Sequence, residues 1–203
     1  EGHHRSPFAK AAYFRHPIHS AGGTMSHEPE GWEAQRAELD VWKGAPLEEL
    51  VQHIVDRYHR EARVEMARLE TQVEEAALME GRRHPVLLEL REEVARFCVD
   101  LRAHLHAEER MLFPALLDLA HGRPPQASED LLEPLKLLED EHGAVAGLFK
   151  RMRSLTDGFV PPADARTSQR KLFETLQALS DSLYRHIYLE NQVLFARVRA
   201  VKM

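Results

Sequence analysis

The sequence is poor in the residues on which several large classes of protein depend. Its single cysteine, Cys98, cannot form an intramolecular disulfide, and no Cys-x-x-Cys motif is present for zinc binding or thiol redox chemistry. Lysine and arginine number 27 against 33 aspartates and glutamates, so the net charge of −6 leaves no broad basic surface. We therefore expect a cytoplasmic protein that does not bind nucleic acid.

Long apolar runs are also absent, and glycine and proline are scarce. No stretch of about eighteen apolar residues is present to span a bilayer, and the N-terminal segment lacks the apolar core of a secretory signal. With 10 glycines and 11 prolines in 203 residues there is little room for low-complexity sequence, and 43 % hydrophobic residues are typical of a globular protein. The sequence predicts a folded domain without membrane contact.

The chain does contain a series of long amphipathic segments, each separated from the next by glycine and proline. Apolar residues recur at helical spacing over four ranges: 46–80, 85–120, 128–156 and 163–201. Pro114 lies inside the second range and should bend its last turns. No alternating strand pattern interrupts these ranges. We predict an all-α fold, an antiparallel up-down-up-down four-helix bundle, over residues 45–203. Residues 1–44 are expected to be an N-terminal extension, partly disordered or added for expression.

The sequence is unusual in its 13 histidines, and two of them begin the same short pattern. The second and fourth predicted helices each carry His-x-x-x-Glu, in one case His104 with Glu108 and in the other His186 with Glu190. Residues four apart lie on one face of a helix, so each pair can offer an imidazole and a carboxylate to a common metal ion. One such pair is weak evidence, because surface pairs arise by chance. The second copy is what indicates a metal site.

An antiparallel bundle provides a test of this idea, because residues at one level lie at similar distances from the connecting turns. His59 lies about twenty residues before the first predicted turn and His104 about twenty after it, so both lie about 30 Å from that turn along the bundle axis. His142 and His186 reach the same middle level when they are counted from their own connections. One histidine per helix at a common depth, beside two carboxylates, is hard to explain as solvated surface.

The chemistry of this set suits a pair of transition-metal ions. Four neutral imidazoles would give two nitrogens to each ion, and the two carboxylates would bridge. Two ferrous ions bring four positive charges against two negative ones, so an oxo or hydroxo bridge or another small ligand should complete the shell. A structural zinc site usually contains cysteine or a compact four-ligand cluster, and neither is present. We expect two iron ions, held by His59, His104, Glu108, His142, His186 and Glu190.

Four motifs resemble a known family. The stretches YHREARVEMARLE around His59, HLHAEERMLFP, EDEHGAVAGLFKRMRSLT and HIYLENQVLF are similar to the hemerythrin-like (HHE) di-iron domain of the repair-of-iron-centres family, over roughly 45–199. The resemblance implies the same six ligands. It also implies a stress-response role in repairing iron–sulfur clusters after oxidative or nitrosative damage, by iron donation, nitric oxide handling or both. The implied partners are nitric oxide, dioxygen or peroxide, and damaged iron–sulfur proteins.

The chain departs from the family pattern in ways that limit this reading. The family commonly has an N-terminal domain with a cysteine pair, and no cysteine precedes residue 45 here. Where the family often shows an HGxxHP turn, this chain reads EGRRHP over 80–85, about 30 Å from the predicted site, so neither Glu80 nor His84 should be a ligand. The sequence does not decide whether the protein is an enzyme that reduces nitric oxide or peroxide.

The main alternative is a sensor or reversible carrier of dioxygen or nitric oxide that does not turn over. Oxygen-carrying hemerythrins add a His-x-x-x-His pair on the third helix. In this chain Ala146 follows His142 at that spacing, so the extra imidazole is missing. We therefore rank the carrier below the repair protein.

Several further residues next to the predicted ligands are candidates for supporting roles. Glu109, Glu141 and Asn191 adjoin ligands in sequence and would orient imidazoles as hydrogen-bond acceptors, the alternative being solvated side chains. Tyr58 and Tyr188 are candidates for gating the site, although an aromatic residue on a bundle face is more often part of the core. Cys98 is expected to be a buried, inert thiol.

Overall fold

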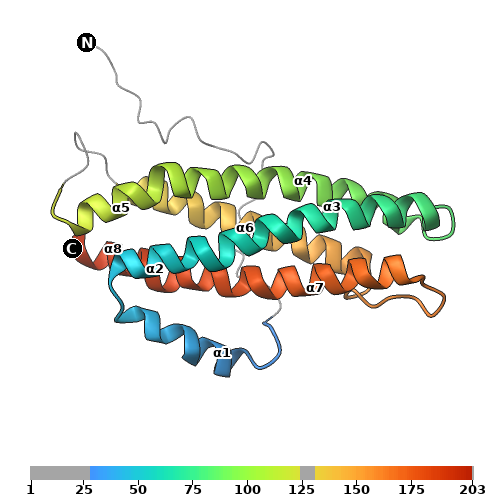
Figure 1. Ribbon diagram of the computed structural model, residues 1–203, viewed down its shortest axis with the longest axis horizontal. Coiled ribbons are helices and arrows are strands. Elements are labelled where there is room, and N and C mark those ends of the chain that lie inside the picture. Colours follow the sequence, from blue (N-terminus) through green and yellow to red (C-terminus); the bar gives the residue numbers. More distant parts are fainter. Residues whose placement is uncertain (1–27, 124–130, 203) are drawn as a thin grey trace, which may run out of the picture.

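The structure is a computed structural model that describes residues 28–123 and 131–202. Its helices form four long rods, and rods that follow one another along the chain run antiparallel (Figure 1). The first comprises α2 (Leu47–His53), η3 (Ile54–His59) and α3 (Arg60–Glu80); the second α4 (Val86–Ala107), η4 (Glu108–Leu112) and α5 (Phe113–Ala120); the third α6 (Leu132–Leu155); the fourth α7 (Thr167–Tyr188), η5 (Leu189–Leu194) and α8 (Phe195–Lys202). No strand occurs among the described residues. The predicted four-helix bundle is confirmed.

The rod boundaries agree with the sequence prediction except where a distant residue decides them. The predicted start of the third helix at 128 lies outside the described residues. The fourth helix was predicted from 163 but begins at Thr167, because the preceding Arg166 has an extended backbone. Glu80 explains this start: its carboxylate accepts hydrogen bonds from the Arg166 N–H and the Ser168 hydroxyl, and so caps the new helix from another rod.

Three of the four rods contain a short π-helical segment that sequence periodicity does not predict. These segments are η3, η4 and η5, and only the third rod lacks one among its described residues. A π turn admits an extra residue into a helix and is often found at functional sites. Pro114, which we expected to bend its helix, falls in the first turn of α5 directly after η4, where its missing N–H interrupts the regular ladder.

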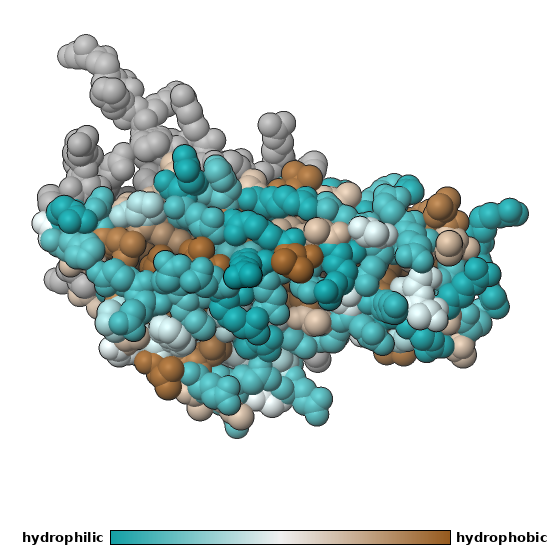
Figure 2. All heavy atoms as spheres, in the orientation of Figure 1, coloured by the Kyte–Doolittle hydropathy of each residue, from teal (hydrophilic) through white to brown (hydrophobic). Residues whose placement is uncertain are grey.

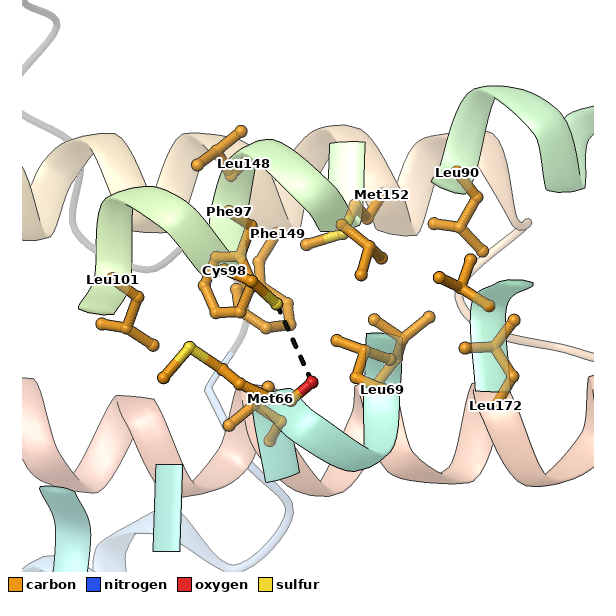
Figure 3. Packing of buried hydrophobic residues seen from close by; sticks show 14 of the residues in the cluster. Met66, Leu69, Leu90, Phe97, Cys98, Leu101, Leu148, Phe149, Met152 and Leu172 are labelled. Carbon is orange, nitrogen blue, oxygen red and sulfur yellow. Dashed lines mark hydrogen bonds between the residues drawn. The ribbon is translucent and has the colours of Figure 1, made fainter. Parts of the chain in front are cut away.

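Two apolar clusters make up the core, one in each half of the bundle. One cluster includes Met66, Phe97 and Leu172, and the other includes Ile54, Leu112 and Phe195. Figure 3 shows the first of these clusters, with Cys98 packed beside Phe97 and its thiol directed at the Met66 carbonyl oxygen, 4.0 Å away. Along each rod a polar layer separates the two clusters, and this layer contains the predicted ligands.

Part of the segment that we expected to be an extension is helical and packs outside the bundle. Helix α1 (Trp32–Leu39) and the 3-10 turn η2 (Asp40–Lys43) lie against the fourth rod, where α1 contacts α7 and η2 contacts η5 (Figure 1). The Trp32 ring meets Tyr184 edge-on with 4.5 Å between ring centroids, and the Tyr188 hydroxyl donates to Asp40. Residues 1–27 lie outside the described part of the chain.

The face seen in Figure 2 is largely hydrophilic, with apolar side chains in small groups. Among the described residues, no helix has both the length and the apolar character needed to cross a membrane.

Cys98 gives a direct test of the core. Burial raises the pKa of its thiol to about 12, so at pH 8 almost none of it is the reactive thiolate. We expect a thiol reagent to label the folded protein at least about a hundredfold more slowly than the protein in denaturant. Equal labelling rates in the two states would show that this part of the core is open.

Candidate metal centre

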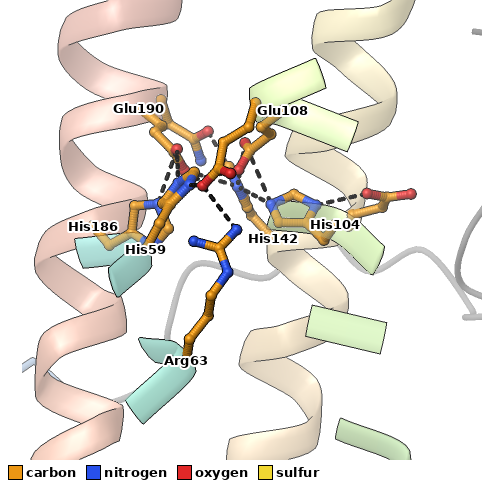
Figure 4. A network of polar contacts seen from close by, with 10 residues as sticks. His59, Arg63, His104, Glu108, His142, His186 and Glu190 are labelled. Atoms are coloured by element: carbon orange, nitrogen blue, oxygen red, sulfur yellow. Dashed lines mark hydrogen bonds and ion pairs between the residues drawn. The ribbon is translucent and has the colours of Figure 1, made fainter. Parts of the chain in front are cut away.

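The six predicted ligands meet in the middle of the bundle, one or two from each rod (Figure 4). The Nε2 atoms of His59 and His186 are 3.0 Å apart, and those of His104 and His142 are also 3.0 Å apart. All six side chains are buried, with Glu108 and Glu190 completely inaccessible. The structure thus brings together the six residues that the spacing argument placed at one level. The sequence predicted two histidines for each ion but not which histidines would pair.

The two carboxylates lie between the histidine pairs and face both. Glu108 places Oε2 3.5 Å from the His59 Nε2 and Oε1 3.4 Å from the His104 Nε2. Glu190 places Oε1 2.9 Å from the His186 Nε2 and Oε2 3.2 Å from the His142 Nε2. Each carboxylate thus turns one oxygen toward each pair. The result is two four-residue groups that share Glu108 and Glu190, and within each group the ligand atoms lie within 4.8 Å of one another.

The unpaired polar atoms at this centre show that the residues fit a bound cation. Both oxygens of Glu108 and Oε2 of Glu190 are buried without a hydrogen-bond partner among the described residues. A buried carboxylate without compensation is costly, so the layer needs positive charge. Metal cations at the two groups would supply it and would use the nitrogens and oxygens that converge there.

Three of the four imidazoles are oriented by hydrogen bonds on the side away from the centre. The Nδ1 of His59 lies 2.7 Å from Glu109 Oε1, and the Nδ1 of His104 lies 2.7 Å from Glu141 Oε2. Because an ionised carboxylate only accepts, each Nδ1 carries the proton and donates. The imidazole can then present its Nε2 lone pair to a metal.

The third oriented imidazole uses a neutral acceptor. The Nδ1 of His142 lies 2.8 Å from Asn191 Oδ1. With the two contacts above, this confirms the orienting role predicted for Glu109, Glu141 and Asn191. His186 differs, since its Nδ1 is buried without a hydrogen-bond partner among the described residues, and the Tyr58 ring stacks on it at 5.7 Å between centroids.

The pKa values of two histidines also indicate that the layer favours positive charge. Burial disfavours protonated His59, but hydrogen bonds to Glu109 and Glu190 outweigh it and raise the pKa to about 9. Burial also opposes protonation of His104, but Glu108 and Glu141 raise its pKa to about 10. The buried carboxylates thus favour positive charge in this layer.

As expected, neither Glu80 nor His84 lies at the centre, whereas the two tyrosines considered as gates differ from each other. Glu80 is buried at the far end of the first rod, where it caps α7, and His84 lies 3.7 Å from Asp164 beside it. The Tyr188 hydroxyl is bonded to Asp40 outside the bundle, which argues against the gating role considered for it. Tyr58, the other candidate gate, is buried against His186 and so contacts the layer.

Sequence reasoning missed Arg63, which contacts the polar layer. Arg63 donates from Nη2 to Glu109 Oε1 at 2.8 Å, the same oxygen that His59 uses (Figure 4). Arg63 follows His59 by four residues and so lies on the same helix face. That spacing is the signal that would have found it.

Comparison with known proteins agrees with this geometry. Residues 50–198 match the Hemerythrin HHE cation binding domain. The iron-sulfur cluster repair protein ScdA of Staphylococcus haemolyticus is 32 % identical over 146 residues, which cover 72 % of this chain and 64 % of that protein. The iron-sulfur cluster repair protein YtfE of Cronobacter sakazakii is 31 % identical over 159 residues, or 78 % of this chain and 69 % of its own. YtfE of Escherichia coli O1:K1 is 30 % identical over 159 residues, which again cover 78 % of this chain and 69 % of that protein. The chain thus spans about two thirds of the length of these relatives.

A pair of substitutions separates the centre from the rest of the fold. Glu108→Ala removes a carboxylate that faces both histidine pairs, and we expect it to abolish most metal binding while the bundle still folds. Glu80→Ala removes the cap of α7, and we expect normal metal content with a free energy of unfolding lower by about 1–2 kcal/mol. Elemental analysis and thermal unfolding measure the two effects. Metal loss in Glu80→Ala equal to that in Glu108→Ala would contradict the assignment.

Proposed function

The chain belongs to the hemerythrin HHE cation-binding domain family, and on that premise we propose that it holds two iron ions and acts in the repair of iron–sulfur clusters. The observation that carries the proposal is the doubled site, in which two histidine pairs share two carboxylates. The names of the relatives, iron-sulfur cluster repair proteins, support the function. The bundle of residues 45–203 would be the domain that performs it, with α1 packed against it.

Each ion has its own residues in this proposal. His59 and His186 would hold one ion, His104 and His142 the other, and Glu108 and Glu190 would serve both. The two carboxylates only half neutralise two ferrous ions, so small anionic ligands from solvent would complete the coordination. When bound, iron supplies reversible electron transfer and exchangeable positions for small ligands.

The protein's own contribution is to hold the imidazoles still and keep the layer dry. Glu109, Glu141 and Asn191 fix three rings through their Nδ1 atoms. Phenylalanine rings cover two of the imidazoles: Phe113 stacks on His59 at 5.6 Å and Phe195 on His142 at 6.1 Å between centroids. Apolar rings at these positions exclude water, which strengthens every charge interaction in the layer.

The repair activity would consist of donating iron to damaged clusters, of removing nitric oxide, or of both. Nitric oxide, dioxygen or peroxide would be the small ligands, and damaged iron–sulfur proteins the partners. A cytoplasmic location follows from the same proposal, since the single thiol is unpaired. On the third helix the buried Ala146 stands where an oxygen carrier has an extra imidazole, which supports repair over carriage.

Transfer of iron tests the repair function directly. Iron-loaded protein, mixed without oxygen with the iron-free form of a cluster enzyme, cysteine and a desulfurase, should restore the cluster absorbance of that enzyme. The control is ferrous iron at the same total concentration, with a chelator in both samples. Restoration no better than with free iron would rule out donation.

Reversibility of the reaction with air separates repair from carriage. Two evenly shared histidine pairs leave both ions with exchangeable positions, so the ferrous protein should oxidise in air and stay oxidised when oxygen is removed under vacuum. The absorbance spectrum before and after vacuum is the measurement. Full return to the ferrous spectrum would favour a carrier.

A further inference from the structure

We propose that the two histidine pairs hold their ions unequally, and that His59 and His186 release theirs first. This inference rests on the proposed function, because it assumes that two ions are bound. It goes further in naming the pair that supplies the transferable ion and the residue, Arg63, that weakens its hold. The argument depends on the hydrogen bonds behind each ring, away from the ions.

The rings of His104 and His142 are both fixed from behind. Glu141 accepts from the His104 Nδ1 at 2.7 Å, and its side chain is only 5 % exposed. Among the described residues, no lysine or arginine forms an ion pair with Glu141. Its full negative charge therefore acts on the His104 imidazole and makes its Nε2 a stronger donor to a metal. Asn191 fixes the second ring of this pair.

The rings of His59 and His186 have weaker support. Glu109 accepts from the His59 Nδ1, but the same oxygen also accepts from Arg63, at 2.8 Å. The guanidinium draws negative charge away from the imidazole, and water competes as well, because the Glu109 side chain is 26 % exposed. Behind His186 there is no hydrogen-bond acceptor among the described residues.

The difference between the pairs is large enough to order the release of two ions. Loss of one outer hydrogen-bond partner typically lowers metal affinity by about 10–100-fold. The pair His59 and His186 lacks one such partner completely and shares the other with Arg63, whereas the shared ligands Glu108 and Glu190 serve both pairs alike. We therefore expect release from His59 and His186 to be at least about tenfold faster.

Arg63 is a positioning residue in this scheme, since it acts on the ion only through Glu109 and His59. Replacing it with methionine removes the charge and keeps an unbranched side chain. Arg102 offers a matched control: its side chain is 43 % exposed, like that of Arg63, and it pairs with Glu70, which belongs to neither group of candidate ligands. Both positions are on the surface, so both variants should fold.

The experiment follows iron release from the fully loaded, oxygen-free protein into excess ferrous chelator. We expect two phases of one ion each, differing by at least about tenfold in rate. Arg63→Met should slow the first phase by several-fold and leave the second unchanged, and Arg102→Met should change neither. Glu141→Gln should accelerate the second phase.

Crystals of the loaded protein, soaked briefly in chelator, identify the position that empties. Anomalous scattering at the iron edge should show loss of the ion beside His59 and His186 while the ion beside His104 and His142 remains. Simultaneous loss, the reverse order, or an Arg63→Met variant with an unchanged first phase would overturn the inference and leave the proposed function standing. A protein that never takes up two ions would instead contradict the proposed function itself.

Discussion

The structure depends on the balance of charge in one polar layer that crosses an apolar core. Glu108 and Glu190 are completely buried, and three of their four oxygens lack a hydrogen-bond partner among the described residues. Such a layer is costly in a bundle that could otherwise be filled with leucine and phenylalanine. Its cost is offset when positive charge enters between the carboxylates, and four imidazoles are arranged to hold that charge.

The rest of the bundle serves to keep these six side chains at one level. Apolar clusters on both sides of the layer lock the rods against one another, and Glu80 fixes where the fourth rod begins. The π segments η3, η4 and η5 each contain or adjoin a candidate ligand, among them His59, Glu108 and Glu190. A local change of helical pitch adjusts the direction of a side chain without moving the rod that carries it.

The sequence predicted the helices and the common level of the six candidate ligands because both follow from spacing within long regular segments. The helical period locates the rods, and the distance of each histidine from its turn gives its level. The sequence did not predict features that depend on contacts between distant segments. The start of α7 is set by Glu80 on another rod, and the packing of Trp32 against Tyr184 joins segments about 150 residues apart. The π segments have no local sequence pattern that would predict them. The contact of Arg63 with the layer, in contrast, could have been predicted from its spacing to His59.

The central claim is that this layer is a site for two cations, and the most direct test is to count them. Metal-free protein, titrated with ferrous iron under strict exclusion of oxygen and followed by calorimetry, should bind two equivalents per chain, and its Tm should rise with each, since the ions bind the folded state. Saturation at one equivalent, or a Tm that does not change with iron, would contradict the account.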